Sequence, residues 1–239
     1  MRRLRRALFR LARTEPMGLV VRLAFAHASA LLPVRRVTET DTVIVFEHPA
    51  PSWRPHLLLV PKRSVRSFRH FWPHETALFA ELVRLAFARA ATLGLDRTGF
   101  ALMINGGAYQ DVAQAHLHLA GLDAGLRYAA PTVRPGTVLM AADGLVAFEH
   151  PDPRRAEHVV IQPEAPRAWR DLDDGAFEQV GAALAGVGRH LVDRSPRLAA
   201  GYTLLASIPP GGLNDPVCFH LVGGVRRETA PPSHGPAPG

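Results

Sequence analysis

The stretch Asn105–Gly121 reads N-G-G-A-Y-Q-D-V-A-Q-A-H-L-H-L-A-G, and its last part alternates polar and apolar residues. Alternate residues of a β-strand point to the same face. We therefore expect Gln114, His116 and His118 on one face of a strand and the intervening leucines on the other, buried face. Two imidazoles and an amide on one face, after a glycine-containing loop, indicate a site for an anion or a metal ion. The alternative is an ordinary solvated strand face.

Two upstream segments extend this pattern. They are Phe46-Glu47-His48-Pro49 and, after a short turn, His56-Leu57-Leu58-Leu59-Val60-Pro61-Lys62. Together with Asn105…Gln110-x-Val112-x-Gln114-x-His116-x-His118, they resemble the signature of the histidine triad (HIT) family of nucleotide hydrolases and transferases. The chain departs from that signature at the first triad position, where Gln114 stands in place of histidine.

The resemblance implies a mechanism as well as a fold. In the family the middle histidine attacks the α-phosphorus of a nucleotide and forms a covalent nucleotidyl-histidine, which places the nucleophile at His116. It gives His118 and Gln114 the role of binding the nonbridging phosphate oxygens. The resemblance implies supporting or substrate-binding roles for four further residues: Asn105 and Gln110 at the phosphate loop, His56 as a buttress of the triad, and Glu47 at the ribose.

The departure at Gln114 has a cost if this side chain contacts the phosphate. An amide can donate a hydrogen bond but carries no positive charge. Losing a charged donor weakens transition-state stabilisation by roughly 1–3 kcal/mol, which is up to about a hundredfold in rate. The sequence therefore predicts a slower enzyme that keeps its nucleophile.

An internal repeat organises the rest of the chain. With a shift of 102 residues and no gap, residues 41–121 and 143–223 share 15 identities in 81 positions, where average composition gives roughly 5. The identities gather at the motifs, including a second Phe-Glu-His-Pro at Phe148–Pro151. The chain therefore reads as a tandem duplication.

The fold class predicted from this repeat is α+β, with two HIT-like domains that pair as an intramolecular pseudo-dimer. Each domain is expected to be an antiparallel meander with one helix packed on it. The expected helices are Glu75–Ala91, entered through Pro73 and closed near Gly94, and a counterpart that opens at Asp173. The expected strands are Thr42–Glu47, His56–Pro61, Gly99–Ile104 and Gln114–Ala120 in the first repeat, and Leu145–Glu149, His158–Gln162, Gly201–Ser207 and Val217–Val222 in the second.

The predicted division of the chain has four parts. Residues 1–36 form a basic and apolar helical segment, 37–130 a HIT-like domain with the candidate active site, 137–228 a degenerate repeat, and 229–239 a disordered tail. The linker is placed at 131–136. The second repeat has Pro216, Cys218 and His220 where the first has its three motif residues, so we expect one active site and one structural partner.

Three classes of function remain open at this point. The first is a nucleotide hydrolase or nucleotidyltransferase working through His116, and the second is a non-catalytic nucleotide-binding or structural HIT-fold protein. The third is a metal-dependent hydrolase with His116, His118 and His56 as ligands. The favoured class implies a nucleotide or nucleotide-conjugate substrate and requires no cofactor or metal. The sequence does not identify the base or the leaving group of that substrate.

Net charge and cysteine content indicate which binding partners and which cellular compartment to expect. The formal net charge of +7 suits an anionic ligand, and equally a nonspecific attraction to nucleic acid or anionic lipid. Six arginines in residues 1–13 form a basic amphipathic pattern that gives a weak expectation of contact with an anionic membrane surface; no nucleic-acid recognition motif is present. The single cysteine excludes an intrachain disulfide and fits a reducing cytoplasm.

Overall fold

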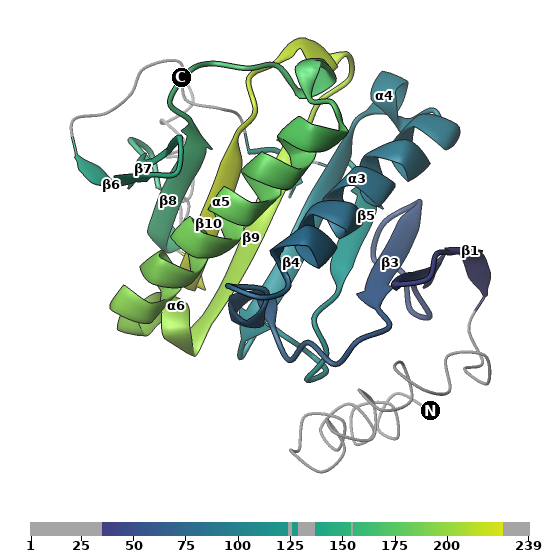
Figure 1. Cartoon of the computed structure of the whole chain (residues 1–239), viewed down its shortest axis with the longest axis horizontal. Helices are drawn as coiled ribbons and strands as arrows, with labels where there is room; N and C mark the ends of the chain where they lie inside the picture. The colour runs from purple at the N-terminus through teal and green to yellow at the C-terminus, as the bar shows by residue number, and fades with distance from the viewer. Residues whose placement is uncertain (1–34, 124–125, 129–136, 154, 227–239) are drawn as a thin grey trace, which may run out of the picture.

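The computed structural model describes residues 35–123, 126–128, 137–153 and 155–226. These residues build one ten-stranded antiparallel sheet with the strand order β1-β2-β3-β5-β4-β9-β10-β8-β7-β6 (Figure 1). The strands are β1 Arg36–Glu39, β2 Val43–Glu47, β3 His56–Pro61, β4 Phe100–Gly107, β5 Leu117–Gly121, β6 Val138–Ala142, β7 Leu145–Glu149, β8 Arg155–Pro163, β9 Gly201–Ile208 and β10 Phe219–Arg226.

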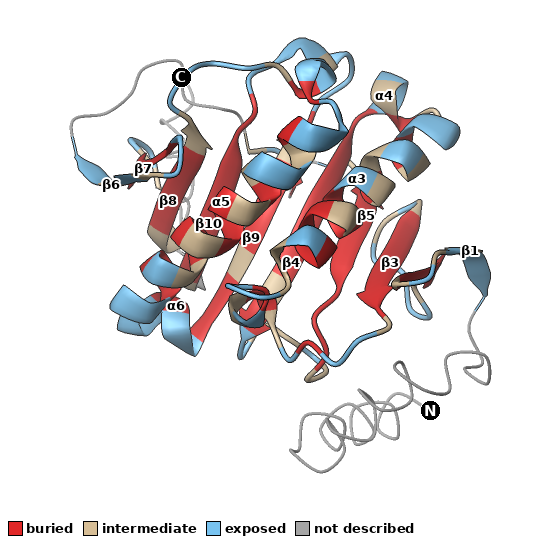
Figure 2. Cartoon of the chain, viewed as in Figure 1, coloured by how far each residue is buried: buried red, intermediate tan, exposed pale blue. Residues whose placement is uncertain are grey.

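Helices cover one face of this sheet. The two long helices, α3 Thr76–Thr92 and α5 Asp174–Arg194, lie side by side across it, and each is followed by a short helix, α4 Leu95–Thr98 or α6 Pro196–Ala200 (Figure 1). Short 3-10 turns, Phe68–His70 and Trp169–Asp171, precede the long helices. The strands are largely buried and the outer faces of the helices are exposed (Figure 2).

The main hydrophobic core lies between the helices and the sheet. Every second residue of the inner strands enters it, as Leu57 and Leu59 do from β3, and the apolar stripe of α3 packs on them with Leu78, Phe79 and Leu82. Such a stripe at helical spacing buries one side of a helix and leaves the other in water. The other residues of the strands point to the opposite face, which carries smaller buried clusters.

The helix ends follow local sequence signals. Asp173 caps α5 by accepting a hydrogen bond from the backbone N–H of Ala176 at 2.8 Å, which satisfies one of the free donors of a helix N-terminus. Gly94 follows α3 with φ of 66°, a left-handed conformation that glycine adopts without strain.

The two repeats join at the β4–β9 pair. Met103 pairs with Leu205, its own equivalent under the 102-residue shift. A pseudo-twofold axis therefore passes through this pair and relates β1–β5 to β6–β10. This confirms the predicted α+β fold, and the continuous sheet shows that the pairing of the repeats occurs within one chain.

Most predicted elements are present, with shifted ends. Strands His56–Pro61 and Leu145–Glu149 match their predicted bounds, but the predicted strand at Gln114 begins only at Leu117 and its counterpart at Phe219. The edge strands β1 and β6 were not predicted, because most of their residues are exposed and so show no alternation of polar and apolar residues.

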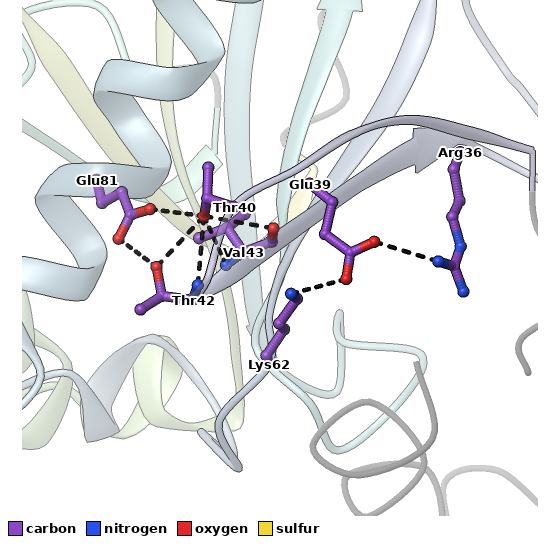
Figure 3. Close-up of polar contacts among 7 residues, drawn as sticks. All are labelled: Arg36, Glu39, Thr40, Thr42, Val43, Lys62 and Glu81. Atoms are coloured by element: carbon purple, nitrogen blue, oxygen red, sulfur yellow. Dashed lines mark hydrogen bonds and ion pairs between the residues drawn. The ribbon is translucent and has the colours of Figure 1, made fainter. Parts of the chain in front are cut away.

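A polar network fixes the β1 edge of the sheet (Figure 3). Lys62 Nζ lies 2.7 Å from a carboxylate oxygen of Glu39, which also pairs with Arg36. Thr40 donates to Glu81 of α3 at 2.9 Å, so the β1–β2 turn is tied to the helix. The lysine of the Pro-Lys motif therefore holds the sheet edge together.

Several predictions concern residues outside the described ranges: the N-terminal helical segment up to residue 34, the linker at 131–136 and the tail from 229 onward. Among the helices of the described residues, none is both long enough and apolar enough to cross a membrane.

Candidate active site

The candidate site lies on the sheet face opposite the helices. Strands β3 and β5 are antiparallel neighbours, and Leu58 pairs with His118. Because Leu57 and Leu59 point toward the helices, His56 and His118 project from the other face. Both side chains are buried there, as is His116.

A chain of hydrogen bonds fixes the tautomer of His118. The backbone N–H of Ser52 donates to His56 Nδ1 at 3.4 Å, so the proton of a neutral His56 resides on Nε2. That nitrogen lies 2.9 Å from His118 Nδ1 and donates to it. His118 then carries its own proton on Nε2, a buried atom that has no hydrogen-bond partner among the described residues.

His116 has the complementary arrangement. Its Nδ1 lies 2.8 Å from the backbone oxygen of Gln114, and a carbonyl oxygen only accepts, so Nδ1 carries the proton. The lone pair of His116 is therefore on Nε2, as a nucleophile requires. The ring centroids of His116 and His118 are 4.8 Å apart, which places a lone pair and an N–H donor side by side.

The electrostatics keep these rings neutral. Burial lowers the pKa of His116, and burial followed by the neighbouring His116, His56 and His48 lowers that of His118 well below its usual value. Burial, with His48 and His116, lowers the pKa of His56 to about 4. Neutral imidazoles at pH 7 are the form in which one nitrogen donates and the other attacks or accepts.

Gln114 does not take the position that the sequence suggested. Its side chain is fully buried, and its amide nitrogen donates to the backbone oxygens of Pro61 at 3.1 Å and Arg63 at 2.9 Å. Both amide protons are therefore used inside the protein. The expectation that Gln114 donates to a phosphate oxygen was wrong for this geometry; the side chain joins the end of β3 to the segment before β5.

The two loop residues lie near the triad in different ways. Asn105 follows Ile104, the last residue of β4 that pairs with β5, and its side-chain oxygen accepts from Thr203 Oγ at 2.6 Å. Gln110 donates to the backbone oxygens of Arg66 and Val112, both at 2.7 Å. The amide of Gln110 therefore braces the loop.

Glu47 lies away from the histidine cluster, whereas His48 lies within it. Alternation along β2 puts Glu47 on the helix-bearing face with Val43 and Val45, where it pairs with Arg35 at 3.2 Å. The suggestion that Glu47 contacts the ribose is therefore corrected. His48 joins the histidine cluster instead: its ring stacks on that of His56 at 4.1 Å between centroids, with 4° between the planes.

The sequence reasoning missed two residues near the triad. His48 was treated only as part of a turn, and its Nδ1 does accept from the backbone N–H of Ala50 at 3.0 Å, which leaves Nε2 as a donor. Asp111 is exposed, and its negative charge raises the pKa of both His48 and His116, against the larger effect of burial. Its place next to Gln110 in the loop was the available signal.

The histidine cluster is a poor geometry for the metal-dependent alternative. His48, His56 and His118 bring one nitrogen each within 4.8 Å of one another. The rings of His48 and His56 are stacked, however, so their in-plane lone pairs lie in two separate parallel planes, and the His56–His118 hydrogen bond occupies two of the nitrogens. A metal ion there requires rotated rings and a broken hydrogen bond.

The second repeat keeps the equivalents of His48, His56 and His118 but has Cys218 at the position of His116. His158 Nε2 lies 3.0 Å from His220 Nδ1, and the other nitrogen of His220 lies 3.6 Å from the sulfur of Cys218. The Tyr128 ring packs against both histidines, with centroid distances of 5.5 and 5.3 Å. Burial raises the pKa of Cys218 to about 12, so the thiol at the nucleophile position is not ionised at neutral pH.

The fold and site together define a class: two fused α+β repeats on one sheet, with the histidine pair His116 and His118 complete in one repeat only. Comparison with known proteins agrees. The model of the HIT domain matches residues 31–125, and a HIT-like protein of Synechocystis is 35% identical over 92 residues, which cover 38% of this chain and 80% of that protein. The chain belongs to the HIT family.

Other comparisons cover one or both repeats. A HIT-like protein of Helicobacter pylori is 28% identical over 94 residues, 38% of this chain and 88% of its own length. A DUF4931 family protein of Bacillus cereus covers 79% of this chain and 85% of its own, with a TM-score of 0.57 and 13% identity. An ADP-glucose phosphorylase of Arabidopsis thaliana covers 84% and 79%, with a TM-score of 0.58 and 10% identity. At these identities the last two show a shared two-repeat fold alone.

Proposed function

We propose that the first repeat is a nucleotide hydrolase or nucleotidyltransferase that acts at a nucleoside α-phosphate through a covalent nucleotidyl-histidine on His116. One observation carries the proposal. Two backbone groups, the N–H of Ser52 and the oxygen of Gln114, set opposite tautomers in adjacent histidines. The result is a lone pair on His116 Nε2 beside a buried N–H of His118 that has no hydrogen-bond partner in the part of the chain that the structure describes.

This pair performs the two tasks of the first chemical step. His116 Nε2 attacks the α-phosphorus, a P–N bond forms, and the bond from phosphorus to the leaving group breaks with its electron pair on the leaving atom. The N–H of His118 donates to a nonbridging oxygen of the phosphoryl group, where negative charge is concentrated in the transition state. Water or a second acceptor then attacks phosphorus and releases His116.

The relatives agree with a nucleotide as substrate. The Arabidopsis protein with the same two-repeat fold is described as an ADP-glucose phosphorylase with bound ADP-glucose. We assign no cofactor to the reaction, because the attacking and stabilising groups are side chains of this chain.

Intact-mass spectrometry tests the proposal. The protein is mixed briefly with adenylated and guanylated substrates, quenched without acid, and compared with His116→Ala. A mass gain of one nucleoside monophosphate in the wild type, absent from the variant, is expected, with product formation followed in the same samples. Cys218→Ser is the matched control and is expected to retain the adduct. Nucleotide binding without adduct or turnover favours the non-catalytic alternative, and an adduct that survives in His116→Ala refutes His116 as the nucleophile.

A further inference from the structure

The loop that follows β4 in the first repeat is attached to the second repeat as well as to its own. Three hydrogen bonds cross between the repeats here. Thr203 Oγ donates to Asn105 Oδ1 at 2.6 Å, the backbone N–H of Ala108 donates to the backbone oxygen of Ala200 at 2.8 Å, and Tyr109 Oη donates to the backbone oxygen of Gly224 at 2.6 Å. The second repeat therefore helps to set the position of the loop that begins at Asn105.

The two repeats also touch closely along the glycines of this loop. A Cβ atom at Gly106 would lie 2.1 Å from the ring of Tyr202, which belongs to β9 of the second repeat. In return, the ring of Tyr109 lies 2.8 Å from the position of a Cβ atom at Gly201. Each repeat thus places a tyrosine ring on a glycine of the other, and the loop has no room to move toward the second repeat.

Asn105 lies between the second repeat and His116. Ile104 pairs with Leu117, and both enter the core under the helices. By continuation of this register, the next residue of each segment, Asn105 and His116, are neighbours on the opposite face. Thr203 is the partner of Asn105 on the other side, in β9. Because β4 lies between β5 and β9 (Figure 1), an Asn105 amide whose oxygen points to Thr203 has its nitrogen on the side of His116.

The second repeat supplies an internal comparison. Under the 102-residue shift, Asn105 and Thr203 correspond to Ser207 and Ala101, which pair at the symmetric place in the sheet. Alanine has no hydroxyl to donate, and Ser207 donates instead to the backbone oxygen of Leu126, in the segment that follows β5. The bond from a hydroxyl to an amide is therefore present beside the histidine nucleophile position and absent from the equivalent place beside the cysteine.

We propose that Thr203 is a positioning residue, which holds the Asn105 amide with its N–H groups toward the phosphoryl group that His116 attacks. The second repeat thereby completes the active site of the first. The inference rests on the proposed function. The distance of 2.6 Å suits an O–H···O bond, and an amide whose oxygen is occupied in this way has only its N–H donors left for a ligand. A nonbridging phosphate oxygen requires such donors. The reversed amide would present its own oxygen to the phosphate and repel it.

A double-mutant cycle of Thr203→Val and Asn105→Ala tests the inference. Valine removes the hydroxyl and keeps the β-branched shape that suits a strand. The readout is the single-turnover rate of nucleotidyl-histidine and product formation at saturating substrate, with diadenosine tetraphosphate and ADP-glucose as probes. We expect Asn105→Ala to slow this rate by about 10–100-fold and Thr203→Val by about fivefold or more. In the Asn105→Ala protein, Thr203→Val should have no further effect, because Thr203 acts through the amide.

Two further variants distinguish positioning from simple stabilisation of the sheet. Thr203→Ser keeps the donor hydroxyl and should return the rate to within about twofold of the wild type. Ser207→Ala, at the symmetric place, is the matched control and should leave the rate unchanged. Thermal melts show that each variant is folded at the assay temperature. If valine unfolds the protein, Thr203→Ala takes its place, since the symmetric position is already an alanine in the sheet.

The outcomes separate this inference from the proposed function. Turnover by the wild type with no slowing in Thr203→Val overturns the inference and leaves the proposed function standing. The same holds if Thr203→Val slows the reaction equally with and without the Asn105 amide, or if the serine variant is as slow as the valine variant. A wild type that forms neither adduct nor product with either probe contradicts the proposed function, and the inference with it.

Discussion

The hydrogen bond between His56 and His118 gives the most direct test of the tautomer arrangement. In His56→Val, nothing donates to His118 Nδ1, and His118 is free to carry its proton there instead of on Nε2. The N–H donor that we propose for the phosphate is then lost for part of the time. In His56→Gln, an amide N–H replaces the imidazole donor and holds the tautomer.

The size of the effect follows from the burial of this pair. A hydrogen bond to a charged group in a buried setting is worth about 1.5–3 kcal/mol, and each 1.36 kcal/mol in the activation free energy is a factor of ten in rate. We therefore expect His56→Val to slow formation of the nucleotidyl-histidine by roughly 10–150-fold, and His56→Gln to recover most of that loss.

The measurement is the single-turnover rate of adduct formation, followed by intact mass and product release. The valine variant also loses ring contacts of His56 with His48 and Trp53, so thermal melts must first show that each variant is folded at the assay temperature. The ¹⁵N chemical shifts of His118 give a second readout, because they distinguish a protonated from an unprotonated ring nitrogen. A rate for His56→Val within threefold of the wild type, or no difference between valine and glutamine, refutes the reasoning.

Three further predictions concern stability and reactivity. Because the folded state lowers the pKa of His56 to about 4 and lowers those of His116 and His118, the unfolded chain binds more protons below about pH 6.5. Stability from these groups is complete above that pH and falls as the pH drops toward the folded-state values; melts between pH 7.5 and 5 measure it, and an unchanged Tm contradicts it. Gln114→Ala removes the donor to two backbone oxygens and should lower the free energy of unfolding by about 1–3 kcal/mol in urea titrations, whereas a change below about 0.5 kcal/mol would show that water replaces the amide at no cost. Cys218 should stay unreactive toward a thiol reagent at pH 8 until the protein is denatured, since burial raises its pKa to about 12; rapid labelling of the native protein would disprove this.

The fold was predictable because the duplication is visible as identities at a constant shift. The buried strands are also predictable from their apolar sequence. His56–Pro61 is a continuous apolar run after its first residue, and its bounds were predicted correctly. The edge strands β1 and β6 gave no such signal, because most of their residues are exposed.

The sequence indicated which histidines lie near one another, but it did not indicate where the side chains of Gln114 and Glu47 point. Alternation assigns a residue to a face of the sheet but does not name its partner, so the pairing of His56 with His118 rested on the family resemblance. Gln114 lies before the start of β5, where its side chain meets free carbonyls at the end of β3. The preference of a buried amide for such partners decides its position, and that preference depends on a contact between segments more than 50 residues apart.

His48 and the arginines of the segment 66–70 were missed for a related reason. A turn histidine and scattered surface arginines are common, and only the folded chain shows that one stacks on His56 and the others line a cavity beside the catalytic loop. The second repeat has the same turn histidine at His150, and its ring stacks on that of His158.

The β4–β9 pair has a consequence for inheritance as well as for shape. Where two identical chains associate through such a pair, every mutation appears twice, and a change that ruins one active site ruins both. Here the partner is encoded separately and tethered by the same polypeptide, so the association does not depend on protein concentration and dilution cannot separate the halves. One half can therefore carry Cys218 and Pro216 where the other has His116 and Gln114, while Met103 and Leu205 still meet at the centre of the sheet.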